Sequence, residues 1–182
     1  NLKNIRKEII VVDDFSSDGS KDIIKKYEKK KLLKAIYNKK NYGKGYCIIS
    51  AKKKITGDIV VIQEADLEYN PKDILKLIKP IIKSSFKVVY GSRILGKKYF
   101  QNLENFSHWI RILGNLFLTL FSNIINKQNL TDAHTCYKVV EVSLFKSIDL
   151  KEKNFNFCPE ITTKISNKKI KILELPISYK GR

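Results

Sequence analysis

Four short apolar runs rich in β-branched residues recur along this chain, and a helical pattern follows each of the first three. The runs lie at about 8–13, 33–37, 58–63 and 86–91, and the helical patterns at about 20–30, 44–55 and 71–83. This alternation favours an α/β fold, in which a mostly parallel sheet is flanked by helices. Because 182 residues suit one domain and no linker or repeat divides them, we expect a single domain over 1–182.

Carboxylates directly follow two of the predicted strands. Asp13 and Asp14 end the first run, and Glu64, Asp66 and Glu68 follow the third. Open α/β sheets bind ligands at the carboxyl ends of their strands, so both groups are expected at one edge of the sheet. Mg²⁺ and Mn²⁺ prefer oxygen ligands and bridge carboxylates to nucleotide phosphates. The pattern therefore favours a metal-assisted nucleotide site, and a solvated acidic turn is the alternative for Glu64, Asp66 and Glu68.

Local signals mark where two helices begin and where one long loop lies. Asn70 and Pro71 are typical of a helix cap and first helical residue, and Ser17 or Asp18 could cap the helix over 21–30. The stretch 94–105 has weak periodicity and mixed polarity, so we expect a loop there.

The chain carries 36 Lys and Arg against 18 Asp and Glu, for a formal net charge of +18. The lysines are scattered over helix faces and loops, and no zinc finger, helix-turn-helix or aromatic RNA platform is present. We therefore expect attraction to an anionic membrane surface and no nucleic-acid partner. The three cysteines are widely spaced, which indicates reduced thiols and a cytoplasmic protein at the inner face of the membrane.

The segment 109–126 is apolar around most of its helical circumference. A polar stripe on one face consists of Arg111, Asn115, Thr119, Ser122 and Asn126. The segment is marginal for crossing a bilayer, which needs about 20 apolar residues. Two interpretations stay open: a core helix whose stripe faces loops, or a membrane-interface helix whose first polar residues face an anionic group.

Several segments, in this order, resemble the motifs of the family 2 inverting glycosyltransferases. They are Val12–Ser20, Asn41–Gly45, Gln63–Pro71, Tyr90–Arg93, Thr131–Lys138, Phe157–Thr162 and Pro176–Arg182. Within that family they are most similar to the polyprenyl-phosphate (dolichol-phosphate) mannosyl- or glucosyltransferase branch. The resemblance covers nearly the whole chain and implies the GT-A, Rossmann-like fold. It has two departures: Glu64 stands where the family usually has Asp, and the family's first strand has no counterpart before Glu8. The domain is therefore expected to be incomplete at its N-terminus and at its C-terminus.

The resemblance implies transfer of a hexose, with inversion, from a nucleotide sugar of the GDP-mannose or UDP-glucose class to a polyprenyl phosphate. It implies Mg²⁺ or Mn²⁺ at Asp66 and Glu68, with Arg93 and Asp132 as catalytic residues. The implied nucleotide-sugar contacts are Asp13, Asp14, Ser16, Asp18, Asn41, Gly43, Lys44 and Glu64. The implied acceptor or phosphate contacts are Arg111, Asn115, Lys138 and Arg182. The alternatives are a family 2 transferase with a glycan or other acceptor, and a non-catalytic remnant that binds membranes or nucleic acid.

Overall fold

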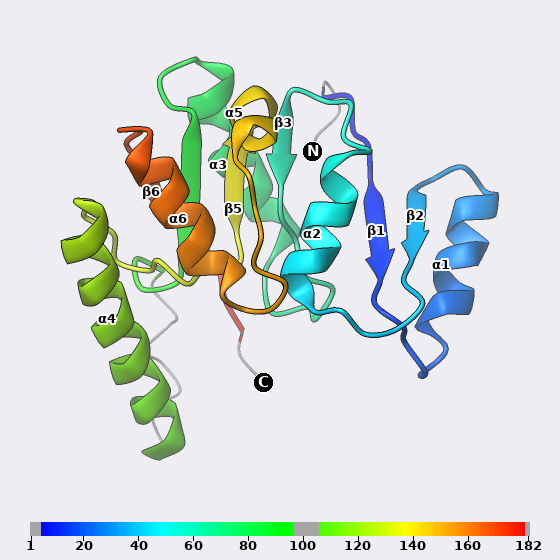
Figure 1. Cartoon of the computed structure of the whole chain (residues 1–182), viewed down its shortest axis with the longest axis horizontal. Coiled ribbons are helices and arrows are strands. Elements are labelled where there is room, and N and C mark those ends of the chain that lie inside the picture. The colour runs from blue at the N-terminus through cyan, green and yellow to red at the C-terminus, as the bar shows by residue number, and fades with distance from the viewer. Residues whose placement is uncertain (1–4, 97–105, 181–182) are drawn as a thin grey trace. The chain divides into compact units, whose positions relative to one another are not determined.

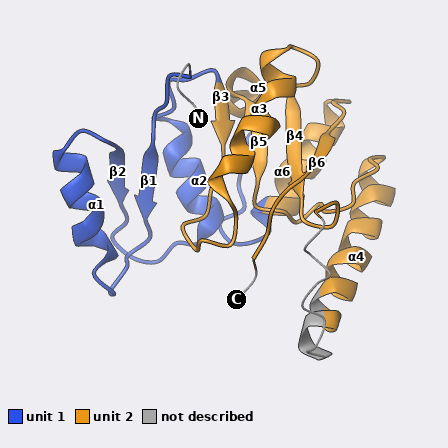
Figure 2. Ribbon diagram, turned by 180° about the vertical axis from the view of Figure 1, so that it is seen from behind, with its two compact units in different colours: residues 1–58, 149–157 blue, residues 59–148, 158–182 orange. Residues whose placement is uncertain are grey.

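The computed structural model describes residues 5–96 and 106–180, without the side chains of residues 106–108 and 111. The chain divides into two compact units, the first formed by residues 1–58 and 149–157 and the second by residues 59–148 and 158–182 (Figure 2). The expectation of one domain over 1–182 stays a prediction. The expected loop at 94–105 lies outside the described residues from residue 97 onward.

The first unit contains a parallel pair of strands, β1 (Ile10–Asp13) and β2 (Lys34–Tyr37), with Asp13 opposite Tyr37. Helix α1 (Ser20–Lys29) makes the crossover between them, as parallel strands require. Its N-cap is Gly19 in the left-handed region, at φ 85°, and the Asp18 carboxylate accepts a hydrogen bond from the Ser20 amide at 3.1 Å. The expected side-chain cap is thus replaced by a glycine, although Asp18 does hold the first helical residue.

The carboxylate of Glu8, just before β1, connects the start of β2 with the segment 56–57. Glu8 accepts hydrogen bonds from Lys34 Nζ at 2.7 Å, from the Thr56 amide at 2.7 Å and hydroxyl at 2.9 Å, and from the Gly57 amide at 3.2 Å. Lys34 first, and then the Thr56 amide, lower the pKa of Glu8 to about 2. Helix α2 (Lys44–Lys52) completes the unit, and its Tyr46 amide donates to the Lys153 carbonyl at 3.0 Å.

The second unit is built on a four-stranded sheet in the order β3-β5-β4-β6. The strands are β3 (Ile59–Val61), β4 (Val88–Ser92), β5 (Lys138–Glu141) and β6 (Leu173–Pro176). Strands β4 and β6 run parallel, whereas β5 is antiparallel to both of its neighbours. The four strands predicted from sequence form within two residues of their expected ends; β5 and β6 were not predicted.

Helices cover this sheet and supply its core. The helices of the unit are η1 (Pro71–Asp73), α3 (Ile74–Ile82), α4 (Phe106–Asn126), α5 (Val142–Ser147) and α6 (Phe157–Asn167). Helix α6 lies in front of the sheet in Figure 1, and α3 lies in front of it in the reverse view of Figure 2. The predicted cap is confirmed, since the Asn70 side chain accepts from the Lys72 amide at 3.0 Å and Pro71 opens the helix. Buried valines of β4 and β5 form the centre of the core.

Candidate active site

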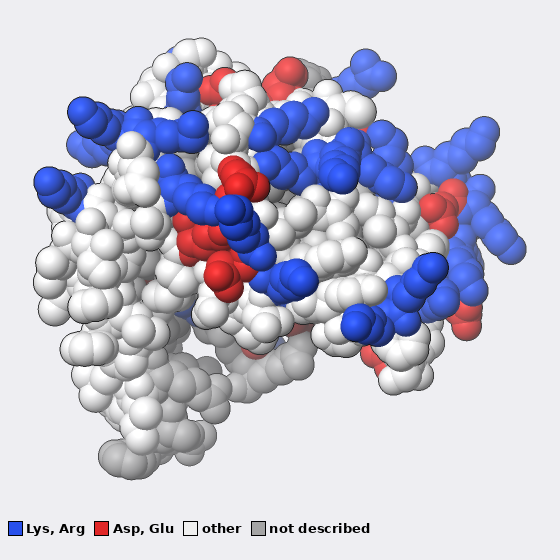
Figure 3. Space-filling view, viewed as in Figure 1, with Lys and Arg blue, Asp and Glu red and all other residues white. Residues whose placement is uncertain are grey.

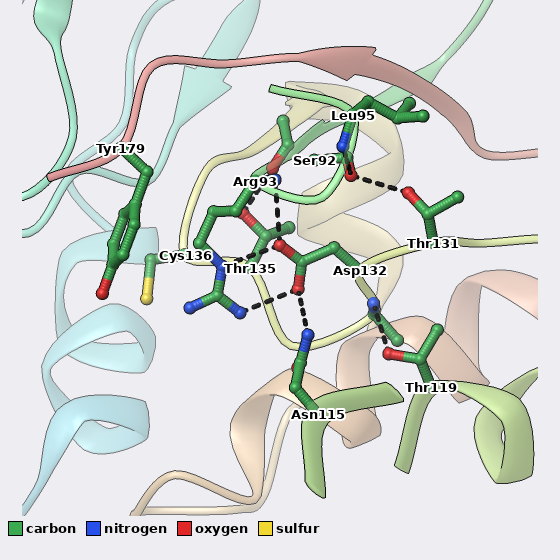
Figure 4. Close-up of polar contacts among 12 residues, drawn as sticks. Ser92, Arg93, Leu95, Asn115, Thr119, Thr131, Asp132, Thr135, Cys136 and Tyr179 are labelled. Atoms are coloured by element: carbon green, nitrogen blue, oxygen red, sulfur yellow. Dashed lines mark hydrogen bonds and ion pairs between the residues drawn. The ribbon is translucent and has the colours of Figure 1, made fainter. Parts of the chain in front are cut away.

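An arginine–carboxylate pair lies at the end of β4. Arg93 follows the last residue of that strand, and its Nε and Nη2 donate to the two oxygens of Asp132 at 2.7 and 2.8 Å (Figure 4). The Arg93 amide donates to the same carboxylate at 3.0 Å, and Asn115 Nδ2 on α4 adds a contact at 3.3 Å. This bidentate geometry is the strongest form of arginine–carboxylate pairing. The structure therefore brings together the two residues that were expected to be catalytic.

The environment of Asp132 keeps it ionised. Its side chain is fully buried, and burial would raise the pKa of Asp132, but the hydrogen bonds and charge of Arg93, with help from Asn115, hold that pKa below its usual value. A carboxylate with a lowered pKa is a weak proton acceptor near neutral pH. Asp132 is therefore suited to orienting a cation, and poorly suited to removing a proton.

The turn that carries Asp132 is fixed from β6 and from β4. Glu174 accepts hydrogen bonds from the Thr131 amide at 2.5 Å, the Thr131 hydroxyl at 2.9 Å and the Asp132 amide at 2.9 Å. The hydroxyls of Thr131 and Ser92 lie 2.6 Å apart. Burial raises the pKa of Glu174, although these hydrogen bonds oppose the rise. Side chains from two neighbouring parallel strands thus hold one short turn.

Helix α4 holds the same turn with Thr119 of the polar stripe and with Asn123, which lies beside the stripe residue Ser122. Thr119 Oγ1 accepts from the Ala133 amide at 3.2 Å, and Asn123 both donates to the Leu130 carbonyl at 2.7 Å and accepts from its amide at 2.9 Å. The stripe residues Thr119, Ser122 and Asn126 are buried, while most of the large apolar residues of the helix are exposed. The amphipathic pattern is therefore inverted relative to an ordinary surface helix, which buries its apolar face.

The acidic segment after β3 is linked to Arg93 through one tyrosine. Asp66 Oδ1 accepts from the Glu68 amide at 3.1 Å, and Glu68 Oε2 accepts from the Tyr179 hydroxyl at 2.9 Å. The Glu68 carbonyl accepts from the Lys180 amide at 2.9 Å. The Arg93 guanidinium lies 5.4 Å from the centre of the Tyr179 ring, within the range of a cation–π contact. The acidic segment and the arginine pair therefore belong to one connected cluster of the second unit.

The expected nucleotide-sugar residues of the first unit form a separate hydrogen-bonded loop. Asp14 accepts from Asn38 Nδ2 at 2.7 Å and from the amides of Tyr42 and Gly43 at 3.0 and 2.8 Å. Burial acts to raise the pKa of Asp14, but these hydrogen bonds outweigh burial and lower that pKa below its usual value. Asp13 is buried and accepts from the Ser16 amide at 3.4 Å. Asp14 thus shapes the loop before α2, which contains Asn41 and Gly43. Lys44 is the first residue of α2.

Residues 1–149 match the family described as glycosyl transferase family 2. The chain belongs to that family. It is 32% identical over 197 residues to a UDP-N-acetylglucosamine–dolichyl-phosphate N-acetylglucosaminyltransferase of Methanococcus voltae, covering 97% of this chain and 76% of the relative. It is 26% identical to a dolichol-phosphate mannosyltransferase of Pyrococcus furiosus, covering 98% of this chain and 49% of that enzyme.

Solved glycosyltransferase structures share the fold. A glucosyl-3-phosphoglycerate synthase from Mycobacterium tuberculosis, bound to Mn²⁺, UDP and glucosyl-3-phosphoglycerate, superposes with a TM-score of 0.70 at 13% identity. That alignment covers 97% of this chain and 62% of the synthase. A mannosyltransferase from Pyrobaculum calidifontis, bound to GDP-mannose and Mn²⁺, gives a TM-score of 0.62 at 18% identity over 93% of this chain and 45% of its own. The GT-A-like α/β fold is therefore confirmed, and this chain spans about half to three-fifths of those solved chains.

In this family 2 glycosyltransferase, the acidic segment fits a cation that also contacts phosphate. Glu64, Asp66 and Glu68 are half-buried and alternate with exposed residues, one of which, Leu67, has φ 64°. Over residues 5–96 and 106–180, no group of three or more His, Cys, Asp or Glu could hold a metal. Mg²⁺-type sites commonly use one or two carboxylates and take their other ligands from substrate phosphates and water. The segment offers carboxylate oxygens, which are the ligand type that such a site uses.

Two of the expected acceptor contacts are engaged within the protein. Lys138 is fully buried, its Nζ donates to the Ala133 carbonyl at 2.8 Å, and it lies 3.7 Å from the centre of the Tyr90 ring. Asn115 donates to Asp132, as described above. The side chain of Arg111 and all of Arg182 lie outside the described residues. Sequence reasoning did not identify Glu174, whose one available signal was a carboxylate inside the apolar run Ile172–Leu175.

Proposed function

We propose that this glycosyltransferase moves a sugar from a nucleoside-diphosphate donor to a polyprenyl phosphate, with inversion at the anomeric carbon. The observation that carries the proposal is the Arg93–Asp132 pair, joined through Tyr179 to the acidic segment. A guanidinium beside a carboxylate-rich segment suits a diphosphate leaving group that is also bound to a divalent cation. The dolichyl-phosphate transferases among the relatives support the acceptor class.

The leaving diphosphate would be stabilised from two sides. Mg²⁺ or Mn²⁺, held by Asp66 and Glu68 with Glu64 beside them, would neutralise part of its negative charge. Arg93 would share the rest, and Asp132 would hold the guanidinium in one orientation. For the first unit, taken by itself, the proposed nucleotide-sugar contacts are Asn41, Gly43 and Lys44 in and after the Asp14-ordered loop, and Asp13, Ser16 and Asp18 in the preceding loop.

The acceptor needs little help from a base. A lipid phosphate is already anionic near neutral pH, so its oxygen can attack the anomeric carbon directly. The new carbon–oxygen bond would form as the bond to the donor diphosphate breaks, and the diphosphate would leave with that electron pair. The lowered pKa of Asp132 fits this mechanism, because Asp132 only orients the guanidinium of Arg93 and removes no proton.

We propose that the outer face of α4 rests on the cytoplasmic surface of a membrane. Its large apolar side chains point outward, with Leu113 60%, Phe117 69% and Ile124 69% exposed. Figure 3 shows this helix as an almost uncharged surface, while Lys and Arg are spread over the rest of the same view. Lysines near an anionic bilayer add about 1 kcal/mol each to binding. Among the described residues, no helix is long and apolar enough to span a bilayer.

Two measurements test the proposed donor and acceptor. Isothermal titration with UDP and GDP, with and without Mn²⁺, should show metal-dependent binding of one nucleotide. Vesicles that contain a short polyprenyl phosphate, incubated with labelled UDP-glucose, UDP-N-acetylglucosamine or GDP-mannose, should gain a lipid-linked sugar with Mn²⁺ and none with EDTA. Transfer should fall at least 100-fold in Arg93→Ala and stay near parental in Lys83→Ala, an exposed basic residue of the same unit. Sugar transfer that is unchanged by EDTA and by Arg93→Ala would refute the mechanism.

A further inference from the structure

We infer that Glu174 is a positioning residue for the transfer reaction, acting through Asp132 on the orientation of Arg93. This inference rests on the proposed function of the Arg93–Asp132 pair. Glu174 lies on β6, opposite Tyr90 of β4 in the parallel register, so it lies three residues before Arg93 on the neighbouring strand. Its carboxylate accepts hydrogen bonds from the turn that carries Asp132, and no hydrogen bond among the described residues joins it to Arg93 or to the acidic segment.

The contacts of Glu174 fix both the backbone and the side chain of that turn. One carboxylate oxygen receives the Thr131 amide and hydroxyl, and the other receives the Asp132 amide. Asp132 then directs its own carboxylate to Arg93. The Asp132 amide donates to the Glu174 carboxylate at 2.9 Å. A movement of that carboxylate would therefore move Asp132, which orients the guanidinium of Arg93.

A carboxylate at position 174 suits the donors of the turn better than a neutral side chain does. Glu174 is half-buried, and its carboxylate is satisfied by three hydrogen bonds from the turn, none of which comes from Lys or Arg. Only a carboxylate offers two acceptor oxygens to two neighbouring amides. A glutamine would turn its NH₂ group toward one of those N–H donors and leave that donor unsatisfied.

A buried cation completes the restraint from the opposite end of the turn. Lys138 donates to the Ala133 carbonyl, two residues after the first amide that Glu174 holds. The anion thus binds N–H groups and the cation binds a C=O group of the same three-residue segment, as their charges require.

The first test uses no catalytic activity. Hydrogen exchange and NMR would follow the amides of Thr131 and Asp132 and the Nε–H of Arg93 in the parent, in Glu174→Gln and in Glu141→Gln. Glu141 is a matched control, because it is a carboxylate of β5 in the same unit that contacts Ser143. In Glu174→Gln we expect exchange at these three sites to rise at least 10-fold, with the amides of Val89 and Val139 unchanged. Unchanged exchange at Arg93 Nε–H would overturn the inference.

The second test is a double-mutant cycle on the transfer rate. Glu174→Gln should lower kcat by 10- to 100-fold and change the donor KM by less than about twofold. Combining it with Asp132→Asn should cause no loss beyond that of Asp132→Asn alone, because both act on Arg93. If the kcat losses of the two single variants multiply in the double variant, Glu174 has an independent structural role and the inference is refuted. If Glu174→Gln does not fold, Glu174→Asp provides the same comparison with the charge retained.

The two tests separate this inference from the proposed function. If the parent binds no nucleotide and transfers no sugar, the proposed function fails, and the exchange experiment still decides whether Glu174 controls Arg93. If the parent is active but Glu174→Gln matches it in kcat, the positioning role is wrong and the proposed function stands.

Discussion

The hydroxyl of Tyr179 donates to Oε2 of Glu68 at 2.9 Å, while the ring of the same residue lies beneath the guanidinium of Arg93. One side chain therefore contacts an acidic residue that follows β3 and a basic residue that follows β4. Burial, and then the Glu68 carboxylate, raise the pKa of Tyr179 to about 12. Tyr179 thus remains a neutral donor across the physiological range.

Tyr179→Phe should weaken metal-dependent nucleotide binding while leaving the fold intact. The substitution keeps the ring against Arg93 and removes one hydrogen bond to Glu68. A hydrogen bond to a charged group contributes about 1.5–3 kcal/mol, so a loss of roughly 10-fold or more in affinity is expected. Isothermal titration with Mn²⁺ measures it, with Tyr27→Phe, an exposed tyrosine of α1, as the control. Equal affinity in both variants would mean that Glu68 needs no restraint.

Asp132→Asn should destabilise the protein in a manner that depends on pH. The pKa of Asp132 is lower in the folded chain than its ordinary value of 3.8, so its stabilising effect is present above that value. The effect is lost as the pH falls through the folded pKa. At pH 7, removing one partner of a buried pair should cost about 3–5 kcal/mol. Urea unfolding at pH 7, 5 and 3.5 should show the penalty shrinking only at the lowest pH, and a constant penalty would contradict the ion pair.

Replacing exposed apolar residues of α4 should reduce membrane binding without unfolding the protein. Serine at Leu113, Phe117 and Ile124 removes outward-facing apolar area, so retention on anionic vesicles should fall at least 10-fold. The melting temperature should change little, because exposed positions contribute within about 0.5 kcal/mol each. Ile112→Ser is the matched control. This residue of the same helix is 1% exposed, so the substitution should lower stability while leaving the exposed apolar side chains of α4 unchanged. Full retention of the triple variant would exclude α4 as the contact.

Gly45→Ala should destabilise the first unit. A methyl group at this position would overlap the carbonyl oxygen of Glu152 and lie 3.0 Å from the carbonyl carbon of Lys153, both of which are backbone atoms. Forcing an added carbon into such a space costs about 1–3 kcal/mol. Gly57→Ala is the control, since nothing lies within 4 Å of its added carbon. Thermal melting should separate the two variants by several degrees, and matched melting would show that the 152–153 segment yields easily.

Periodicity predicted the elements that local sequence determines. The Asn70–Pro71 helix start and the strands before Asp14 and Glu64 follow from side chains adjacent in the chain. Strand β5 was missed, because Lys138 opens it, and a lysine at a buried position can be recognised only once Tyr90 and Ala133 are seen to surround its ammonium. The antiparallel direction of β5 depends on pairing with β3 and β4, which are distant in sequence.

The pairing of Arg93 with Asp132 was predicted in part. Both residues were expected at the site from motif order, but their direct contact joins positions 39 residues apart and depends on the turn between α4 and β5. The stripe on α4 was read correctly as one face, and two interpretations of it were left open. The structure shows that the stripe faces the 130–133 turn, because Asn115 donates to the Asp132 carboxylate and Thr119 accepts from the Ala133 amide.

The hydrogen bonds of α4 also limit how the length of this helix can vary. Asn115, Thr119 and Asn123 contact Asp132, Ala133 and Leu130, all in one turn, from one side of the helix. An α-helix turns by about 100° per residue, so one residue inserted between Asn115 and Thr119 would rotate the later contacts away from the turn. The same insertion would swing apolar side chains inward and polar ones outward. Substitutions on the outer face are therefore compatible with this site, whereas single-residue insertions or deletions inside α4 are not.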